Sequence, residues 1–98
     1  QQHTLYLTTQ NPHGVRALLS AVIGFGPAHK VRVISPDVGG GFGGKAPMYN
    51  EEVACLWAAK MLHRPVKWTC DRSEAFVADA HGRDHWTEVS LALDAEGK

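Results

Sequence analysis

A glycine-rich loop between a predicted strand and a predicted helix constrains this chain more than any other feature. Residues 37–45 read DVGGGFGGK, with five glycines among them. Glycine is used where the backbone needs a positive φ or where a ligand must touch the main chain. Successive N–H groups in such a turn can form a concave anion site, to which a helix N-terminus adds. Because ordering five glycines costs much conformational entropy, we favour a binding loop over a flexible surface connection.

Four segments have the composition of β-strands. They are rich in β-branched and aromatic residues, and most alternate apolar with polar positions: residues 4–9, 30–35, 66–70 and 85–94. The last segment alternates most clearly, because Thr87, Val89, Leu91 and Leu93 share one side. We therefore expect it to be a strand with one face turned toward a core.

Two main helices are predicted between the first three strands. Asn11 suits an N-cap and Pro12 a first helical position, and one apolar face follows at helical spacing: Val15, Leu18, Leu19, Val22 and Ile23. The second helix follows the glycine loop and stops at Pro65, with an apolar face of Tyr49, Val53, Leu56, Trp57 and Met61. Residues 73–80 fit a short helix or a loop. The order β-α-β-α-β-β predicts an α/β fold with a mixed sheet, and α+β remains open.

Length and charge limit the classes of protein that the chain can belong to. With 98 residues, it is a single unit (residues 1–98) with no internal boundary. Its net charge of zero argues against nucleic-acid binding, and no apolar run is long enough for a bilayer. No signal peptide pattern opens it, so we expect a cytoplasmic protein. Residues 94–98 form a turn directly after a strand, so we expect a fragment of a larger protein.

Cysteine and histidine do not form a recognisable metal or redox motif. Cys55 and Cys70 are far apart and are expected to be reduced packing residues. His81 and His85 are four residues apart, but Gly82 lies between them and a strand follows, so no metal site is predicted.

The glycine loop matches neither of the common nucleotide-binding loops. A P-loop requires Ser or Thr after the Lys, and here Ala46 follows Lys45. A GxGxxG pattern can be placed on Gly39, Gly41 and Gly44. This pattern also requires an acidic residue at the end of a strand about 20 residues later, and here the end of a predicted helix lies at that distance. The loop therefore predicts a different ligand, while Lys45 is equally suited to contact a phosphate or to extend into solvent.

The sequence DVGGGFGGK after the strand VRVIS resembles the molybdopterin-contacting loop of the molybdenum hydroxylases, the family of xanthine dehydrogenase, aldehyde oxidase and aerobic carbon monoxide dehydrogenase. Three further segments resemble this family in the same order: TTQNPHGVR at residues 8–16, RPVKWTCDRSEAF at 64–76 and HGRDHW at 81–86. The resemblance covers nearly the whole chain, and several motifs in order are more specific than one glycine run.

The resemblance implies a set of cofactor-binding residues. The family's Gln, here Gln10, hydrogen-bonds an inorganic ligand of the molybdenum, and the backbone amides of Phe42 and Gly43 face a molybdenum oxygen. The set is completed by the other loop glycines, Gly39, Gly40, Gly41 and Gly44. Phe42 would also exclude water, although a core aromatic is the alternative. Ala46 stands where xanthine-oxidising members have Glu, which argues against a xanthine-type purine substrate.

The resemblance also implies the function of the intact protein: a molybdenum-dependent oxidoreductase that uses molybdopterin in a dinucleotide form. Its partners would be the rest of the large subunit, iron–sulfur and flavin domains or subunits, and a small-molecule substrate. The family's catalytic Glu lies outside this chain, which contains no catalytic residue, so we expect the isolated chain to be inactive, to bind cofactor weakly and to self-associate. A non-catalytic α/β interaction module and a generic phosphate- or nucleotide-binding module remain alternatives.

Overall fold

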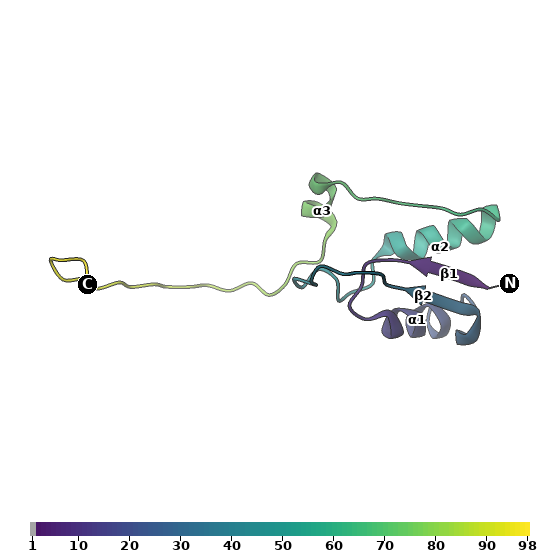
Figure 1. The fold of residues 1–98 in the computed structure, drawn as a ribbon, viewed down its shortest axis with the longest axis horizontal. Helices are drawn as coiled ribbons and strands as arrows, with labels where there is room; N and C mark the ends of the chain where they lie inside the picture. The colour runs from purple at the N-terminus through teal and green to yellow at the C-terminus, as the bar shows by residue number, and fades with distance from the viewer. Residues whose placement is uncertain (1) are drawn as a thin grey trace.

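The computed structural model describes residues 2–98. Its elements are β1 (His3–Tyr6), α1 (Pro12–Ala21), the 3-10 turn η1 (Ala28–Lys30), β2 (Val31–Ile34), α2 (Asn50–Leu62) and α3 (Arg72–Ala78). The strands β1 and β2 pair in parallel, with His3 opposite Val31 and Tyr6 opposite Ile34. Figure 1 shows α1 and α2 on opposite sides of this two-stranded sheet. The first part of the chain is therefore a βαβ unit with a second helix packed on it.

Local sequence signals explain where the two main helices begin and end. The Asn11 side chain accepts a hydrogen bond of 2.9 Å from the Gly14 N–H, and Pro12 opens α1, so the predicted cap is confirmed. The helix ends before Gly24, which has a φ of +75°. At the end of α2, His63 takes the left-handed conformation with φ 51°. Pro65 follows and prevents another turn.

The core is small because the sheet has only two strands. It consists of six buried apolar residues: Leu5, Val15, Leu19, Phe25, Val31 and Leu56. Leu19 is 0% exposed, whereas Leu18 and Val22 on the predicted face of α1 are exposed. On α2, Leu56 is buried and Trp57 is exposed. The narrow sheet therefore covers only part of each apolar face that the sequence predicts.

The chain after α2 differs from the prediction. Residues 66–70 and 85–94 are not strands, and α3 is the only helix or strand among the described residues that follow α2. The undecided segment is helical, because Asp71 caps α3 by accepting a 2.8 Å hydrogen bond from the Glu74 N–H. A strand requires a neighbouring strand to which its backbone can hydrogen-bond. Within residues 2–98, neither residues 66–70 nor residues 85–94 lie beside such a strand. The α/β character is confirmed, and the predicted order β-α-β-α-β-β is wrong in its last two strands.

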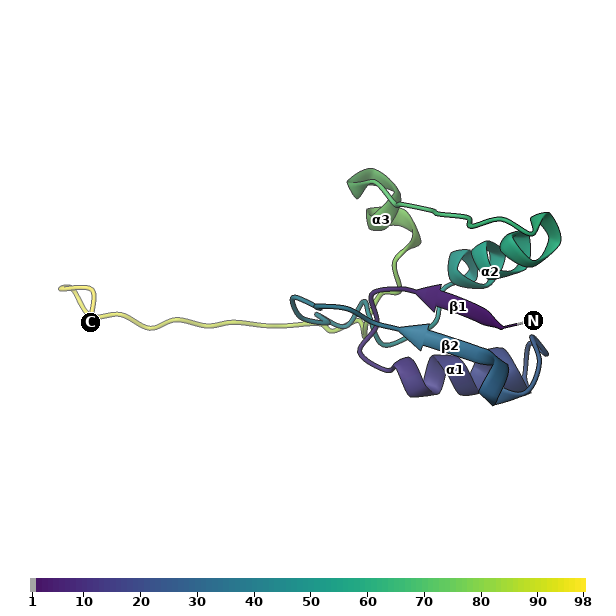
Figure 2. The ribbon, with the colours of Figure 1, turned by 45° about the vertical axis from the view of Figure 1, so that its right-hand side comes forward.

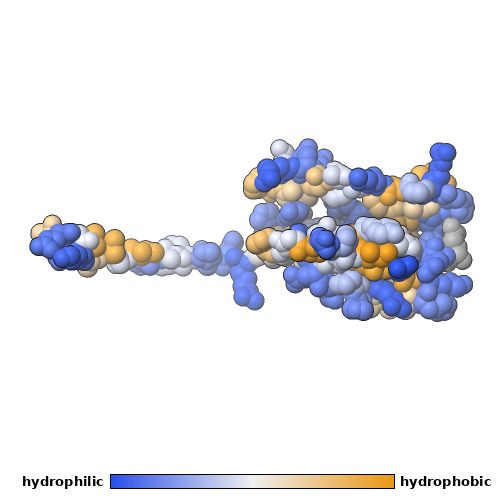
Figure 3. All heavy atoms as spheres, in the orientation of Figure 1, coloured by the Kyte–Doolittle hydropathy of each residue, from blue (hydrophilic) through white to orange (hydrophobic). Residues whose placement is uncertain are grey.

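The C-terminal segment gives the molecule an elongated shape. Figures 1 and 2 show residues after α3 running away from the packed unit as a single extended line. The molecule measures 72 × 25 × 24 Å, and its radius of gyration is 19.8 Å. A compact chain of this length would have a radius of gyration of about 13 Å. Figure 3 shows hydrophobic residues along this tail. The large side chains of Trp86, Val89 and Leu91, which belong to the tail, are exposed. Within residues 2–98, no helix has the length and apolar character needed to cross a membrane.

Candidate functional site

The glycine loop and Gln10 lie together at the carboxyl end of the sheet. The loop leaves β2 after Ile34, and the segment that contains Gln10 leaves β1 after Tyr6, so parallel pairing places both at one edge. The Gln10 N–H donates a 3.1 Å hydrogen bond to the carbonyl of Lys45, at the end of the glycine loop. The structure therefore brings together residues that the sequence separates by a helix and a strand.

A small polar network fixes these two segments to each other. Thr9 is 3% exposed, and its carbonyl accepts a 2.8 Å hydrogen bond from the Ser35 hydroxyl. The Thr9 hydroxyl donates to the carbonyl of Lys45 at 3.3 Å and accepts from the Asn11 N–H at 3.2 Å. Sequence reasoning missed Thr9 and Ser35 as parts of the site. The sequence predicts both inside strands, whereas in the structure both follow a strand at the same end of the sheet.

Residues 40–44, which we call the Phe42 turn, have an unusual backbone. Gly40, Phe42 and Gly43 have φ angles of +107°, +49° and +80°, and the Gly44 N–H donates a 3.0 Å hydrogen bond to the Gly41 carbonyl. A positive φ is uncommon for a residue with a Cβ and is found in turns and functional sites. Phe42 is 93% exposed, so the alternative that it is a core aromatic is wrong.

Close contact between Gln10 and the Phe42 turn requires glycine at position 41. A Cβ placed on Gly41 would overlap Oε1 of Gln10. At Gly40, an added Cβ would lie 2.6 Å from Cε2 of Phe42, and the positive φ there already disfavours other residues. These glycines therefore allow the Gln10 carboxamide and the Phe42 ring to lie directly against the loop backbone.

The Phe42 turn carries hydrogen-bond donors that the chain does not use. Among residues 2–98, no group accepts a hydrogen bond from the N–H of Phe42 or Gly43, and none bonds to the Gln10 carboxamide. Successive backbone N–H groups in such a turn bind anions or electronegative atoms. The site can therefore offer backbone and carboxamide N–H donors, all neutral, to a ligand on its open side.

The start of α2 does not extend this donor set. The helix begins at Asn50, and the Tyr49 N–H that precedes it donates to Oε2 of Glu52 at 3.2 Å. Burial raises the pKa of the Glu52 carboxyl, although the hydrogen bond from Tyr49 acts in the opposite direction. With Glu51 and Glu52 in its first turn, this helix end is unsuited to a second anion. The expected contribution of the helix N-terminus to the loop stays a prediction.

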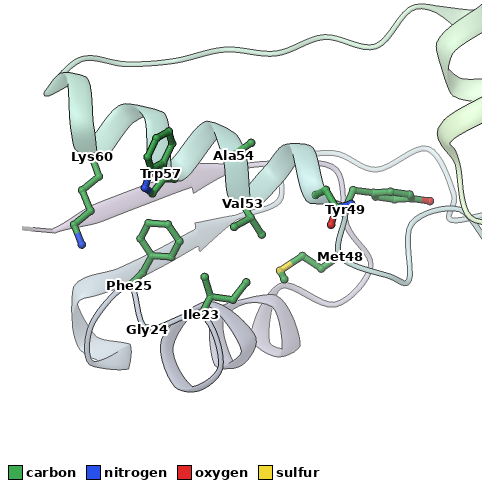
Figure 4. Close-up of a pocket in the computed structure, with 10 residues that line it drawn as sticks. Ile23, Gly24, Phe25, Met48, Tyr49, Val53, Ala54, Trp57 and Lys60 are labelled. Atoms are coloured by element: carbon green, nitrogen blue, oxygen red, sulfur yellow. The ribbon is translucent and has the colours of Figure 1, made fainter.

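A separate apolar groove lies between the end of α1 and α2 and has a volume of about 470 Å³. Figure 4 shows Ile23, Phe25, Val53 and Trp57 around it, with Lys60 at one end. The Lys60 Nζ lies 5.6 Å from the centroid of the Phe25 ring. Polar groups do not converge in this groove as they do at the Phe42 turn.

Metal ligands and cysteine pairs do not add to the site. Within residues 2–98, no group of three or more His, Cys, Asp or Glu side chains is placed to hold a metal ion. Cys55 and Cys70 are free and half-buried. The chemistry of the site therefore rests on hydrogen-bond donation and backbone shape.

Comparison with known proteins matches this arrangement to one family. The sequence profile of the molybdopterin cofactor-binding domain matches residues 1–98. The chain is 44% identical over 95 residues to the carbon monoxide dehydrogenase large chain of Hydrogenophaga pseudoflava, covering 97% of this chain and 12% of that protein. It is 43% identical over 94 residues to the nicotine 6-hydroxylase large subunit of Paenarthrobacter nicotinovorans, covering 96% of this chain and 11% of that protein.

A plant relative extends the comparison to aldehyde oxidases. The chain is 38% identical over 96 residues to an indole-3-acetaldehyde oxidase of Zea mays, covering 97% of this chain and 7% of that protein. No solved structure matches the chain. The chain thus spans about a tenth of the length of these relatives, and it aligns over nearly all of its own length. It belongs to the molybdopterin cofactor-binding domain family of the molybdenum hydroxylases.

Proposed function

We propose that this chain forms one wall of the molybdopterin site in a molybdenum-dependent oxidoreductase. The observation that carries this proposal is the Phe42 turn, whose Phe42 and Gly43 N–H groups are unpaired within residues 2–98 and whose Gly41 lies against the Gln10 side chain. Family membership supplies the cofactor that such a set of donors would bind. The alternative of a generic phosphate-binding module lacks this support, since the family match is to a molybdopterin cofactor-binding domain.

The chain's own residues would bind and orient the cofactor. The Gln10 carboxamide and the N–H groups of Phe42 and Gly43 donate hydrogen bonds to electronegative ligands of the metal without adding charge. Gly40 and Gly41 let side chains lie directly against the loop backbone, and we propose that Gly39 and Gly44 contact the cofactor with them. The Phe42 ring, which is exposed in this chain, would shield the site from water. When bound, molybdopterin supplies the two-electron redox chemistry, and the protein supplies its position and surroundings.

The intact protein would be a multi-component enzyme. Relatives are named as a large chain and a large subunit, which supports a complex with further subunits. We propose iron–sulfur and flavin centres as electron acceptors, the rest of the large subunit as the other walls of the site, and a dinucleotide form of the pterin. The reaction would be oxygen insertion into a C–H bond of a small molecule or carbon monoxide oxidation. Ala46 after Lys45 disfavours a xanthine-type purine.

The sharpest test of the site is Gly41→Ala in the complete protein. The new methyl group would displace the Gln10 carboxamide, so we expect turnover to fall while most of the molybdenum stays bound. Gly82→Ala is the matched control, because a Cβ at Gly82 meets no atom within 4 Å and no positive φ is required there. Equal turnover in both variants would contradict the proposal.

Gln10→Ala separates hydrogen bonding from loop shape. Removing one preorganised donor from a reaction site typically costs about 10²- to 10³-fold in turnover. We expect a loss of this order with most of the molybdenum retained, and no loss for Gln2→Ala, which changes the same residue type at the other end of β1. The isolated 98-residue chain should hold no stoichiometric molybdenum, since the Phe42 turn is open on one side; elemental analysis of the purified chain measures this directly.

A further inference from the structure

Tyr49 joins two segments that are far apart in the sequence. Its hydroxyl donates a 2.6 Å hydrogen bond to the Gly44 carbonyl and accepts a 3.2 Å hydrogen bond from the Ala80 N–H. The sequence pattern placed Tyr49 on the apolar face of α2 together with Val53. Figure 4 instead shows its ring pointing away from the groove that Val53 and Phe25 line.

The contact with Gly44 acts on the Phe42 turn. The Gly44 N–H closes this turn by donating to the Gly41 carbonyl at 3.0 Å, while the Gly44 carbonyl receives the Tyr49 hydroxyl. The next residue, Lys45, is held through its carbonyl by Thr9 and Gln10. The end of the turn is therefore fixed on one side by the carboxyl end of β1 and on the other by Tyr49.

The contact with Ala80 is the link to the C-terminal part of the chain. Within residues 2–98, it is the only hydrogen bond that connects residues 64–98 to residues 2–63. Ala80 follows α3 closely, and the rest of this region makes only local hydrogen bonds. The phenol group thus holds the segment after α3 and the Phe42 turn at the same oxygen atom.

We propose that Tyr49 is a positioning residue that couples the segment after α3 to the Phe42 turn. This inference rests on the proposed function, because it treats the turn as a cofactor contact. Tyr49 acts through the Gly44 carbonyl and has no role in the reaction itself. Movement of residues 79–81 alters the hydrogen bond that the hydroxyl accepts from Ala80, and with it the position of the hydroxyl and its strength as a donor to the Gly44 carbonyl.

Tyr49→Phe tests the coupling, because it removes the hydroxyl and keeps the ring. The matched control is Tyr6→Phe, the only other tyrosine, which lies exposed on β1. In the complete protein without cofactor, each of the two segments loses one neutral hydrogen bond, which should speed its amide exchange roughly 5- to 10-fold. We expect this in peptides covering residues 41–45 and 79–81, and only in Tyr49→Phe. The loaded enzyme should lose kcat by a similar factor at unchanged KM.

Two results separate failure of this inference from failure of the proposed function. Exchange of residues 41–45 at the wild-type rate in Tyr49→Phe would overturn the role of Tyr49, whatever the cofactor does. Equal exchange of the Phe42 and Gly43 amides in loaded and cofactor-free wild-type protein would instead overturn the proposed cofactor contact. Faster exchange in both segments together with cofactor protection of Phe42 and Gly43 supports both.

Discussion

Residues 2–63 and residues 64–98 both carry clear hydrophobic patterns, yet only the first region packs. The first contains the parallel pair β1–β2, two flanking helices and all six buried core residues. The second contains one short helix and an extended tail, and none of its residues is buried. The difference lies in the availability of partners, since the tail alternates more regularly than either observed strand.

The comparison shows what a local pattern can and cannot specify. The alternation of apolar and polar residues shows which side of a segment stabilises the fold when it is buried. A strand also requires a neighbouring strand that pairs with its backbone N–H and C=O groups. The crossover through α1 returns β2 to β1 within one chain. Residues 85–94 have no such neighbour among the described residues, so they expose the face that the pattern predicts to be buried.

The largest expected effect is a core truncation in the packed region. Leu19→Ala removes the most buried side chain and should lower the free energy of unfolding by about 2–5 kcal/mol. Leu91→Ala makes the same change on the exposed tail and should stay within about 0.5 kcal/mol. Urea unfolding followed by far-UV circular dichroism measures both. Similar losses would show that the tail packs in solution and that the contrast between the two regions is wrong.

The second effect concerns association through the tail. An unpaired strand with an apolar face is a template for pairing with another chain, and an introduced Lys opposes such pairing. Val89→Lys should therefore lower the apparent mass of concentrated protein to that of a monomer. Ser90→Lys places the same charge on the polar side and should leave association unchanged. Light scattering across a concentration series distinguishes them, and a monomeric wild type would contradict the expectation.

The sequence predicts the packed region well because its signals are local. Asn11 and Pro12 mark the start of α1, and the spacing of Val15 and Leu19 identifies the buried face. The same local signals could not show whether residues 66–70 and 85–94 form strands, because strand pairing depends on contacts with distant parts of the chain. The sequence leaves residues 73–80 open between a short helix and a loop. In the structure, the cap formed by Asp71 starts the helix α3 there.

The sequence groups the glycine run and Gln10 into one candidate site, whose role stays a prediction, and it does not identify the residues that hold them together. The glycine run and Gln10 were identified from sequence, and the structure places them in contact. Thr9 and Tyr49 were missed, because their hydrogen bonds span 36 and 31 residues and join loops whose approach depends on the fold. Hydrogen bonds of this kind can be identified only once the structure shows which strand ends lie together at one end of the sheet.

A smaller effect compares the same helix cap in the two regions. Asn11→Ala removes the acceptor for the Gly14 N–H in the packed region and should cost about 1 kcal/mol of stability. Asp71→Ala removes the equivalent acceptor from α3, whose helix should fray while the unfolding midpoint of the packed region stays the same. Denaturant midpoints and helical signal, measured together, separate these outcomes. An equal midpoint shift in both variants would mean that α3 unfolds cooperatively with the rest.

The smallest expected effect is the pH dependence that Glu52 contributes. Burial raises its pKa above the ordinary value of 4.5, so the folded chain holds this proton more tightly than the unfolded chain. Its contribution to stability is therefore complete below the unfolded pKa and is lost as the pH rises through the folded pKa. Glu52→Gln should reduce the loss of stability with rising pH just above pH 4.5. Urea midpoints collected through the mildly acidic range provide the test, and parallel curves for wild type and Glu52→Gln would refute a raised pKa for Glu52.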